Sequence, residues 1–317
     1  MVRKTYKITE IDANQRIDKY IKKVLPLAPA GFIYKLFRKK DIKINNFSAF
    51  PGSILKEGDE VMIFLTDEQL NSFSREYYFA KMPLTADIIY EDDAILVLDK
   101  PRGILVHSTI FAKKDTLTNQ VLTYLEEKGQ FDPKNRGYIP SPVNRIDQQT
   151  SGIIIFAKTL VAAQALGNTF QDSDNITRKY LAICSGKVQK SGVINLPLKK
   201  EELEYGSEVT VDEEGKEAIT KYKAIKYFNN LSLVAIEILT GRTNQIRVHM
   251  ARINHPILGD TKYGDSLLND FLDVRQLCLH CHEIQIKNID ERFEYLKKVK
   301  LVAPMPEDFN KILARLD

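Results

Sequence analysis

The feature that most constrains the fold is a short apolar run, Ile153–Ala157, that directly follows a polar segment. Its length and β-branched composition are typical of a buried strand. Arg145 and Asp147 lie two residues apart in the polar segment, just before a Thr-Ser-Gly turn. A segment that feeds a rigid core element can hold a reactive group still. The alternative interpretation is a surface ion pair beside a turn. Other segments of the chain are needed to choose between a reactive site and such an ion pair.

Positive charge is concentrated near the N-terminus. Residues 1–74 contain 13 Lys and Arg against 9 Asp and Glu, whereas the remaining residues contain 33 of each. A basic module on an electrically balanced body is typical of attachment to nucleic acid through phosphates. A solvated charged face is the alternative interpretation. The 317 residues suffice for one large domain and a small one.

The cysteines and the apolar runs indicate the compartment. Three cysteines are too few for a disulfide framework, no apolar run is long enough to cross a membrane, and no apolar segment follows the basic N-terminus. We therefore expect a cytoplasmic monomer away from membranes. Cys278, His280, Cys281 and His282 lie close together, but no second Cys pair completes a tetrahedral zinc site, so no metal is expected.

The N-terminal module is predicted to combine two helices with a small sheet. Residues 14–25 and Gly31–Lys39 each place apolar side chains on one helical face, and the second helix presents Lys35, Arg38 and Lys39 outward. Strands are expected at Ile42–Ile44 and Val61–Leu65, and a turn is expected at Asn45-Asn46.

This order of elements resembles the S4 RNA-binding domain over roughly residues 14–66. The resemblance implies that the basic residues from Lys35 onward face RNA. Residues 67–80 are polar and small, which predicts a linker. We therefore expect an S4-like RNA-binding domain at residues 1–74, a linker to about 83, and a second domain at residues 84–317.

The second domain alternates strands with helices. Helices are predicted at Thr116–Glu127 and Leu160–Phe170, and a hairpin joins strands at Ala218–Tyr227 and Leu231–Leu239. The mixed order predicts an α+β fold in which helices pack against a large mixed, mainly antiparallel sheet.

The segment around Asp147 resembles the signature of a known family. NRIDQQTSGIIIFAK is similar to H-R-L-D-x-x-T-S-G plus a hydrophobic strand, the signature of the RluA-type pseudouridine synthases. In that family the aspartate is catalytic, which implies this role for Asp147. Asn144 stands where histidine is common, and an amide cannot titrate near neutrality as histidine does.

Four further segments resemble the same family in the right order and spacing. They match K-P-x-G-x-x-V-H, K-x-Y-x-A, G-R-T-H-Q-I-R-V-H and R-x-x-L-H, with Asn244 replacing the histidine of the third pattern. The resemblance covers about residues 85–290 and implies a catalytic domain of the pseudouridine synthase type. The four segments are Asp99–His107, Thr177–Ala182, Leu239–Gly264 and Arg275–His280.

The chemistry that the family performs needs few groups. Conversion of uridine to pseudouridine breaks the bond from sugar to nitrogen and rejoins the uracil through carbon, so no atoms enter or leave and no cofactor is expected. One ionised carboxylate suffices, as a nucleophile or as a base. Burial favours a neutral Asp147, so a cation has to keep it charged. The resemblance implies Arg247 as that cation, with Arg242 as the other candidate. A bidentate pair between arginine and carboxylate would also fix the orientation of the carboxylate.

Three more residues are assigned by the resemblance. Tyr180 offers an aromatic face for uracil and a hydroxyl that can move a proton, with core packing as the alternative. Leu279 is an apolar wall of the pocket or an ordinary core residue. Arg145 can occupy the space left by a base flipped out of an RNA helix.

The resulting hypothesis is an RNA pseudouridine synthase whose partner is structured RNA. Its layout resembles bacterial enzymes that act on large-subunit ribosomal RNA, and transfer RNA is an open alternative. An inactive RNA-binding ribosome-assembly factor is a second class, although it would not need the acid at Asp147. A glycosidase-like hydrolase is a third class, but it would need two carboxylates beside the scissile bond.

Overall fold

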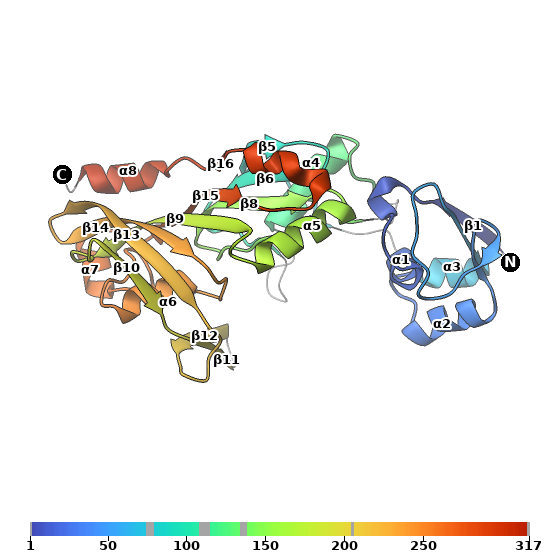
Figure 1. Cartoon of the computed structure of the whole chain (residues 1–317), viewed down its shortest axis with the longest axis horizontal. Coiled ribbons are helices and arrows are strands. Elements are labelled where there is room, and N and C mark those ends of the chain that lie inside the picture. Colours follow the sequence, from blue (N-terminus) through green and yellow to red (C-terminus); the bar gives the residue numbers. More distant parts are fainter. Residues whose placement is uncertain (1, 74–78, 108–114, 134–137, 204–205, 316–317) are drawn as a thin grey trace.

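The computed structural model describes residues 2–73, 79–107, 115–133, 138–203 and 206–315 (Figure 1). An N-terminal unit and a larger C-terminal unit lie next to each other along the long axis of the molecule. Each unit has hydrophobic cores of its own. Within the described ranges, no helix combines the length and the apolar character needed to span a bilayer.

The N-terminal unit packs its helices on a four-stranded sheet of order β1-β4-β2-β3. Asn45 and Asn46 have positive φ angles of 50° and 71°, and they form the tight turn that the sequence predicted after β2. The short strand β3 that follows this turn was not predicted. The elements are β1 (Val2–Lys7), η1 (Glu10–Asp12), α1 (Ile17–Val24), α2 (Ala30–Arg38), β2 (Ile42–Ile44), β3 (Phe47–Ser48), β4 (Glu60–Leu65) and α3 (Asp67–Phe73).

The prediction of a linker at residues 67–80 was wrong for the first part of this segment, which forms helix α3. Leu70 and Phe73 lie three residues apart, so they share one helical face, and both pack against the N-terminal core. The rings of Phe73 and Phe32 are 4.6 Å apart. The polar composition of the segment concealed this narrow apolar face.

The C-terminal unit is built on one mixed sheet of order β10-β13-β14-β9-β15-β8-β6-β5. All neighbours along this path are antiparallel except β15 and β8, which confirms the predicted large, mainly antiparallel sheet. The strands are β5 (Asp87–Glu91), β6 (Ile95–Lys100), β7 (Ser141–Pro142), β8 (Ser151–Ala157), β9 (Ile176–Ser185), β10 (Ser191–Asn195), β13 (Ile219–Phe228), β14 (Leu231–Ile238), β15 (Leu279–Ile286), β16 (Leu301–Val302) and the separate pair β11 (Leu198–Leu203) and β12 (Gly206–Val211).

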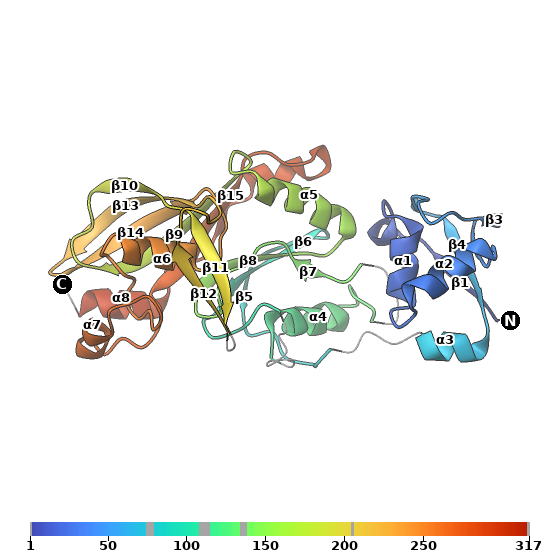
Figure 2. The same ribbon diagram turned by 90° about the horizontal axis from the view of Figure 1, so that it is seen from below.

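Helices on both sides of β8 explain its apolar sequence. Ile153 and Ile155 lie in the core that contains α5 residues, whereas Ile154 and Phe156 lie in the core that contains α4 residues. Figure 2 shows these two helices on opposite sides of β6 and β8. A strand covered on both faces has no position for a polar residue. The helices are α4 (Leu117–Glu127), α5 (Leu160–Gln171), α6 (Gln245–Arg252), α7 (Ser266–Phe271), η2 (Glu291–Lys298) and α8 (Glu307–Ala314).

Gly152 allows β8 to start directly against β15. Its φ is +109°, and a Cβ atom there would lie 2.2 Å from the carbonyl oxygen of Cys281. Opposed residues form one row across β6, β8, β15 and β9, namely Lys100, Gly152, Cys281 and Tyr180. The loop that enters β8 therefore arrives at the middle of the sheet.

Candidate active site

Asp147 lies in the loop between β7 and β8, and hydrogen bonds fix both ends of this loop. The Thr150 N–H donates to the Asp147 carbonyl at 3.1 Å, which forms a turn after the acid. Upstream, the Asn144 amide donates to the Ile153 carbonyl at 3.0 Å and accepts the Ile155 N–H at 2.8 Å. Asn144 thus bonds to β8 as a neighbouring strand would, so its amide positions the loop.

The segment after β6 fastens the same loop from the other side. The buried Lys100 ammonium donates to the Gln148 carbonyl at 3.0 Å and to two carbonyls of its own loop. The Gly103 N–H also donates to the Gln148 carbonyl, and the Gln148 side chain donates back to the Gly103 carbonyl at 2.8 Å. Burial lowers the pKa of Lys100 to about 8, while the nearby Asp147 carboxylate acts in the opposite direction. The Lys-Pro-Arg-Gly segment therefore shapes the loop that carries Asp147.

Tyr180 lies on β9 and is 7% exposed. Its neighbour on β15 is the buried Cys281, which lies directly opposite it. Burial raises the pKa of Tyr180 well above its ordinary value, and the charge of Asp147 adds to the shift. The phenol is therefore protonated at neutral pH, when it can donate a proton or a hydrogen bond.

Arg247 on α6 is the arginine that reaches Asp147. Its Nη1 is 3.6 Å from an Asp147 carboxylate oxygen, and it donates to the Asn244 side-chain oxygen at 3.0 Å. The bidentate pair, however, is with Asp260, whose two oxygens accept from Nε and Nη2 at 2.8 Å each. The expectation of a bidentate pair between Arg247 and Asp147 was therefore wrong. Two of the three guanidinium nitrogens are already engaged by the second aspartate.

Asp260 was not singled out from the sequence, although it organises Arg247. Its side chain is fully buried and also accepts the N–H groups of Lys262 at 2.9 Å and Tyr263 at 3.0 Å. Burial acts to raise the pKa of Asp260, but the hydrogen bonds and charge of Arg247 outweigh burial and lower it. The sequence signal is local, because an aspartate that accepts backbone N–H groups two and three residues later forms a turn.

The carboxyl of Asp147 is balanced between opposing effects. Burial raises its pKa, the charge and hydrogen bond of Arg247 lower it, and the negative charge of Asp260 raises it further, for a net pKa above the ordinary value. The side chain is still 30% exposed. One cation at 3.6 Å therefore does not offset burial, so the carboxyl is easier to protonate than an ordinary aspartic acid.

The comparisons with known proteins agree with this geometry. A family model described as RNA pseudouridylate synthase matches residues 94–252. A relative from Haemophilus ducreyi, "Ribosomal large subunit pseudouridine synthase C", is 32% identical over 98% of this chain and 95% of its own. The chain belongs to the RNA pseudouridine synthase family. The resemblance to the RluA type is thereby confirmed.

Other relatives of the enzyme point the same way. "Ribosomal large subunit pseudouridine synthase C" of Rickettsia bellii is 31% identical over 94% of this chain and 96% of its own. "Human RNA Pseudouridylate Synthase Domain Containing 4" has a solved structure with a TM-score of 0.57 and 21% identity, covering 72% of this chain and 92% of that one. At that identity the structural match shows the shared fold.

The other residues predicted for the enzyme's site are dispersed. Leu279 is 3% exposed and pairs with Ala182 of β9, so it belongs to the core under the site. Arg145 is exposed. Arg242 is exposed too, and its Nε donates to the Glu217 carbonyl at 2.8 Å, so it is not the arginine that contacts Asp147.

The basic residues predicted for RNA contact lie in the other unit. Lys35, Arg38 and Lys39 are exposed at α2 and its C-terminal end, as the helical pattern predicted. The buried face of the same helix holds Ile33 and Leu36. These cations are therefore available to a partner of the N-terminal unit.

The cysteines and histidines near β15 have structural partners. His280 bonds to the Ser151 hydroxyl at 2.9 Å, and His282 bonds to the Ala303 carbonyl at 2.7 Å. Cys278 and Cys281 are fully buried. In the described part of the chain, no group of three or more His, Cys, Asp or Glu side chains could hold a metal ion.

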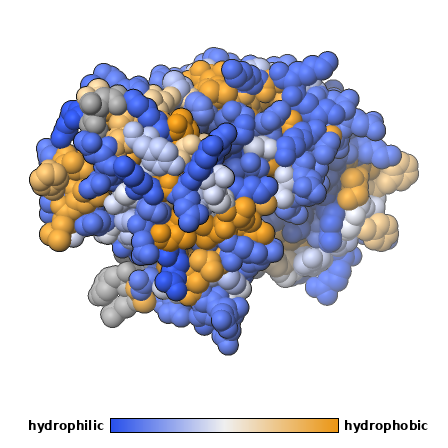
Figure 3. Space-filling view, turned by 60° about the vertical axis from the view of Figure 1, so that its left-hand side comes forward, coloured by the Kyte–Doolittle hydropathy of each residue, from blue (hydrophilic) through white to orange (hydrophobic). Residues whose placement is uncertain are grey.

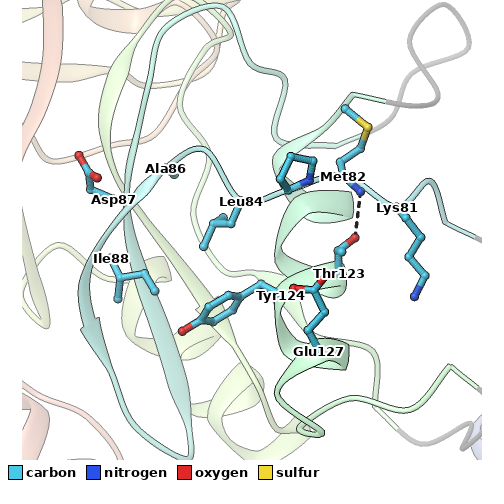
Figure 4. Close-up of a pocket in the computed structure, with 10 residues that line it drawn as sticks. Lys81, Met82, Leu84, Ala86, Asp87, Ile88, Thr123, Tyr124 and Glu127 are labelled. Carbon is cyan, nitrogen blue, oxygen red and sulfur yellow. Dashed lines mark hydrogen bonds between the residues drawn. The ribbon is translucent and has the colours of Figure 1, made fainter.

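Two hollows differ in their relation to this site. A polar hollow of about 120 Å³ adjoins the Arg247–Asp260 pair and is also lined by Gln149 and Thr261. A larger hollow of about 670 Å³ lies away from Asp147, between α4 and the chain leading into β5 (Figure 4). The face seen in Figure 3 is mostly hydrophilic, with apolar patches between the hydrophilic side chains. The smaller hollow is the one relevant to the enzyme, because it adjoins Arg247, which lies next to Asp147.

Proposed function

We propose that this protein isomerises uridine to pseudouridine in RNA, with Asp147 as the catalytic carboxylate. The observation that carries the proposal is the setting of Asp147, in a fixed loop at the middle of the sheet, next to Arg247 and facing Tyr180. A carboxylate held in this way can attack C1′ of the ribose or remove the 2′ proton.

Arg247 then positions the Asp147 carboxylate and favours its charged form against the effect of burial. Because Asp260 and Asn244 hold the guanidinium, the remaining Nη1 hydrogen is available to the Asp147 carboxylate. Tyr180 lines the floor of the site, where its ring can stack on uracil and its hydroxyl can move a proton. Arg145 and Arg242 are exposed at the rim and suit contacts with RNA phosphates or with the gap left by a flipped base.

We infer that the substrate is large-subunit ribosomal RNA. The support is that several relatives of near full-length similarity carry the name ribosomal large subunit pseudouridine synthase. Transfer RNA is the alternative substrate. An activity on ribosomal RNA fits a protein of the cytoplasm, and we take the monomer as its working state.

We infer that residues 1–74 form an S4-like RNA-anchoring domain, joined by a linker to about 83 to a catalytic domain at 84–317. The cations of α2 support this role because they are exposed. Phe47 and Phe50, on β3 and just after it, are 79% and 75% exposed, and exposed aromatic rings stack readily on unpaired bases.

The test is direct. Purified protein is incubated with large-subunit ribosomal RNA and, separately, with transfer RNA, both from cells lacking this protein, and pseudouridines are mapped at nucleotide resolution. New pseudouridine in the ribosomal RNA is the expected result. Modification of transfer RNA alone would change the substrate. Tight binding without modification of either RNA would favour the inactive assembly factor.

A further inference from the structure

A buried cation without a carboxylate partner lies on the active-site face of β9. Arg178 precedes Tyr180 by two residues, so both side chains project from the same face of the strand. Arg178 is only 9% exposed. Among the described residues, no carboxylate forms an ion pair with it, although a buried charge is costly unless it is paired.

Only part of the Arg178 guanidinium is engaged. Nη2 donates to the carbonyls of Leu239 at 3.1 Å and Ile238 at 3.5 Å, whereas Nε is buried with no hydrogen-bond partner. Nη1 borders Gly241, where an added Cβ atom would lie 3.2 Å from it. The absence of a side chain at Gly241 therefore leaves open space beside this nitrogen.

Two other buried cations near Asp147 are committed to protein groups. Arg247 is held by Asp260 and Asn244, and Lys100 donates to three carbonyls. Arg178 differs from both because its Nη1 retains donors for a ligand. Arg178 also lies close enough to Tyr180 for its charge to lower the pKa of the phenol, whereas the charge of Asp147 raises that pKa.

The isomerisation creates a charge that needs such a donor. When the N1–C1′ bond breaks, its electron pair goes to the uracil ring, whether Asp147 attacks C1′ or removes the 2′ proton. The negative charge spreads to the two ring oxygens. Later the ring bonds to C1′ through C5, as Asp147 leaves C1′ in the first route or returns the 2′ proton in the second. The C5 proton leaves and N1 gains a proton, so the overall change is an isomerisation. Donors aimed at a developing anion in a dry site accelerate such a step strongly.

We propose that Arg178 donates through Nη1 to an oxygen of the target uracil and stabilises the anion formed when the glycosidic bond breaks. This inference rests on the proposed function, because it needs uridine to react beside Asp147. It adds a second catalytic cation whose duty differs from that of Arg247: Arg247 serves the carboxylate, and Arg178 serves the base.

The experiment compares Arg178→Met and Arg178→Lys in single-turnover isomerisation of RNA. The Met variant removes the charge, and we expect its rate to fall roughly 10²–10³-fold while RNA affinity changes little. The Lys variant keeps the charge and should recover much of that rate. Lys179→Met is the matched control, because Lys179 points to the other face and pairs with Glu283 at 2.7 Å. A normal rate in Arg178→Met would overturn the inference.

A second variant and a second substrate separate catalysis from structural support. Gly241→Ala fills the space beside Nη1 without removing charge, and we expect a rate loss of about tenfold with an unchanged melting temperature. In RNA with 5-fluorouridine at the target position, fluorine makes the departing ring a weaker base. The Arg178→Met variant should then slow consumption of the target nucleotide much less than it does with uridine.

The outcomes distinguish this inference from the proposed function. Equal losses on both substrates, with no rescue by lysine and no effect of Gly241→Ala, would show that Arg178 only supports the fold. If Arg178→Met does not fold, a normal rate in Gly241→Ala would still refute the inference. An active Asp147→Asn variant would instead refute the proposed function, whatever Arg178 does.

Discussion

Arg247 and Lys35 are both basic residues on helices, yet their surroundings differ sharply. The Arg247 side chain is 12% exposed and has hydrogen bonds or ion pairs with Asp260, Asn244 and Asp147. Lys35 is exposed at the surface of α2. Burial makes the effect of a charge depend on the exact position of each partner, whereas exposure leaves a charge that solvent and salt screen. Single changes should therefore be severe at the site and graded on α2.

The largest expected effect is that of Asp147→Asn. Because an amide can neither attack C1′ nor take a proton, isomerisation should fall at least ~10⁴-fold. RNA affinity should stay within a few-fold of normal, since the anchoring surface is unchanged. Single-turnover rates and filter binding measure the two quantities. Full activity in this variant would refute the proposed mechanism.

The next largest effect is that of Asp260→Asn, which leaves Arg247 buried without a carboxylate of its own. Removing one partner of a buried pair costs about 3–5 kcal/mol, so the free energy of unfolding and the rate should both fall. Because the folded pKa of Asp260 lies below 3.8, its stabilisation is present above that pH and is lost as the pH falls further. Denaturant unfolding at several pH values measures the change.

An aspartate in an exposed pair provides the control for this variant. Asp270 pairs with Arg275, and their side chains are 62% and 69% exposed. Asp270→Asn should change the free energy of unfolding by less than about 1 kcal/mol. Equal losses in the two variants would contradict the contrast between buried and exposed charges.

An intermediate effect is expected when the cations of α2 are removed together. Replacing Lys35, Arg38 and Lys39 by glutamine should weaken RNA binding roughly 10–100-fold near physiological salt, because each contact with a phosphate releases counterions. The slope of log affinity against log salt should become shallower by about 2–3. Binding measured over a salt series tests this. An unchanged slope would mean that α2 does not meet the RNA backbone.

The smallest expected effect concerns a half-buried aspartate, whose exposure lies between that of Asp260 and that of Asp270. Asp99 of β6 lies directly opposite Asp87 of β5. Burial, reinforced by the charge of Asp87, raises the pKa of Asp99 to about 6. Its ionisation therefore destabilises the fold as the pH rises through 6, and Asp99→Asn should stabilise the protein by roughly 0.5–1 kcal/mol at pH 8.

The same pair gives a clean internal control. Well below pH 3.8, Asp99 is protonated in both the folded and the unfolded protein. The stabilisation by Asp99→Asn should therefore disappear there. Melting temperatures of the parent and the variant across this range test the sign. A stabilisation that persists in acid would point to a cause other than charge.

Local pattern predicted much of the fold. The apolar run became β8, the segments around 116–127 and 160–170 became α4 and α5, and the predicted hairpin does join β13 to β14. These elements follow from periodicity and turn residues, which act over a few positions. Helix α3 was missed because only Leu70 and Phe73 mark its buried face.

The catalytic roles of Asp147, Tyr180 and Arg247 stay predictions that rest on the family resemblance. The structure places Arg247 3.6 Å from Asp147. That Arg247 is bidentate to Asp260 could not be inferred, because the two lie on different elements and strand and helix patterns say nothing of their separation. The role of Asn144 was likewise visible only once its amide was seen bonded to β8.

By itself, the sequence determined the elements of this protein, its concentration of positive charge near the N-terminus and the acid that sits before a buried strand. These depend on neighbours along the chain. The tertiary structure decided which charged groups have hydrogen-bond partners. Asp260 accepts from Arg247 and backbone carbonyls accept from Lys100, whereas Arg178 retains an N–H donor without an acceptor. The reason is physical, because the energy of a buried charge depends on groups within a few ångströms in space, wherever they lie in the sequence.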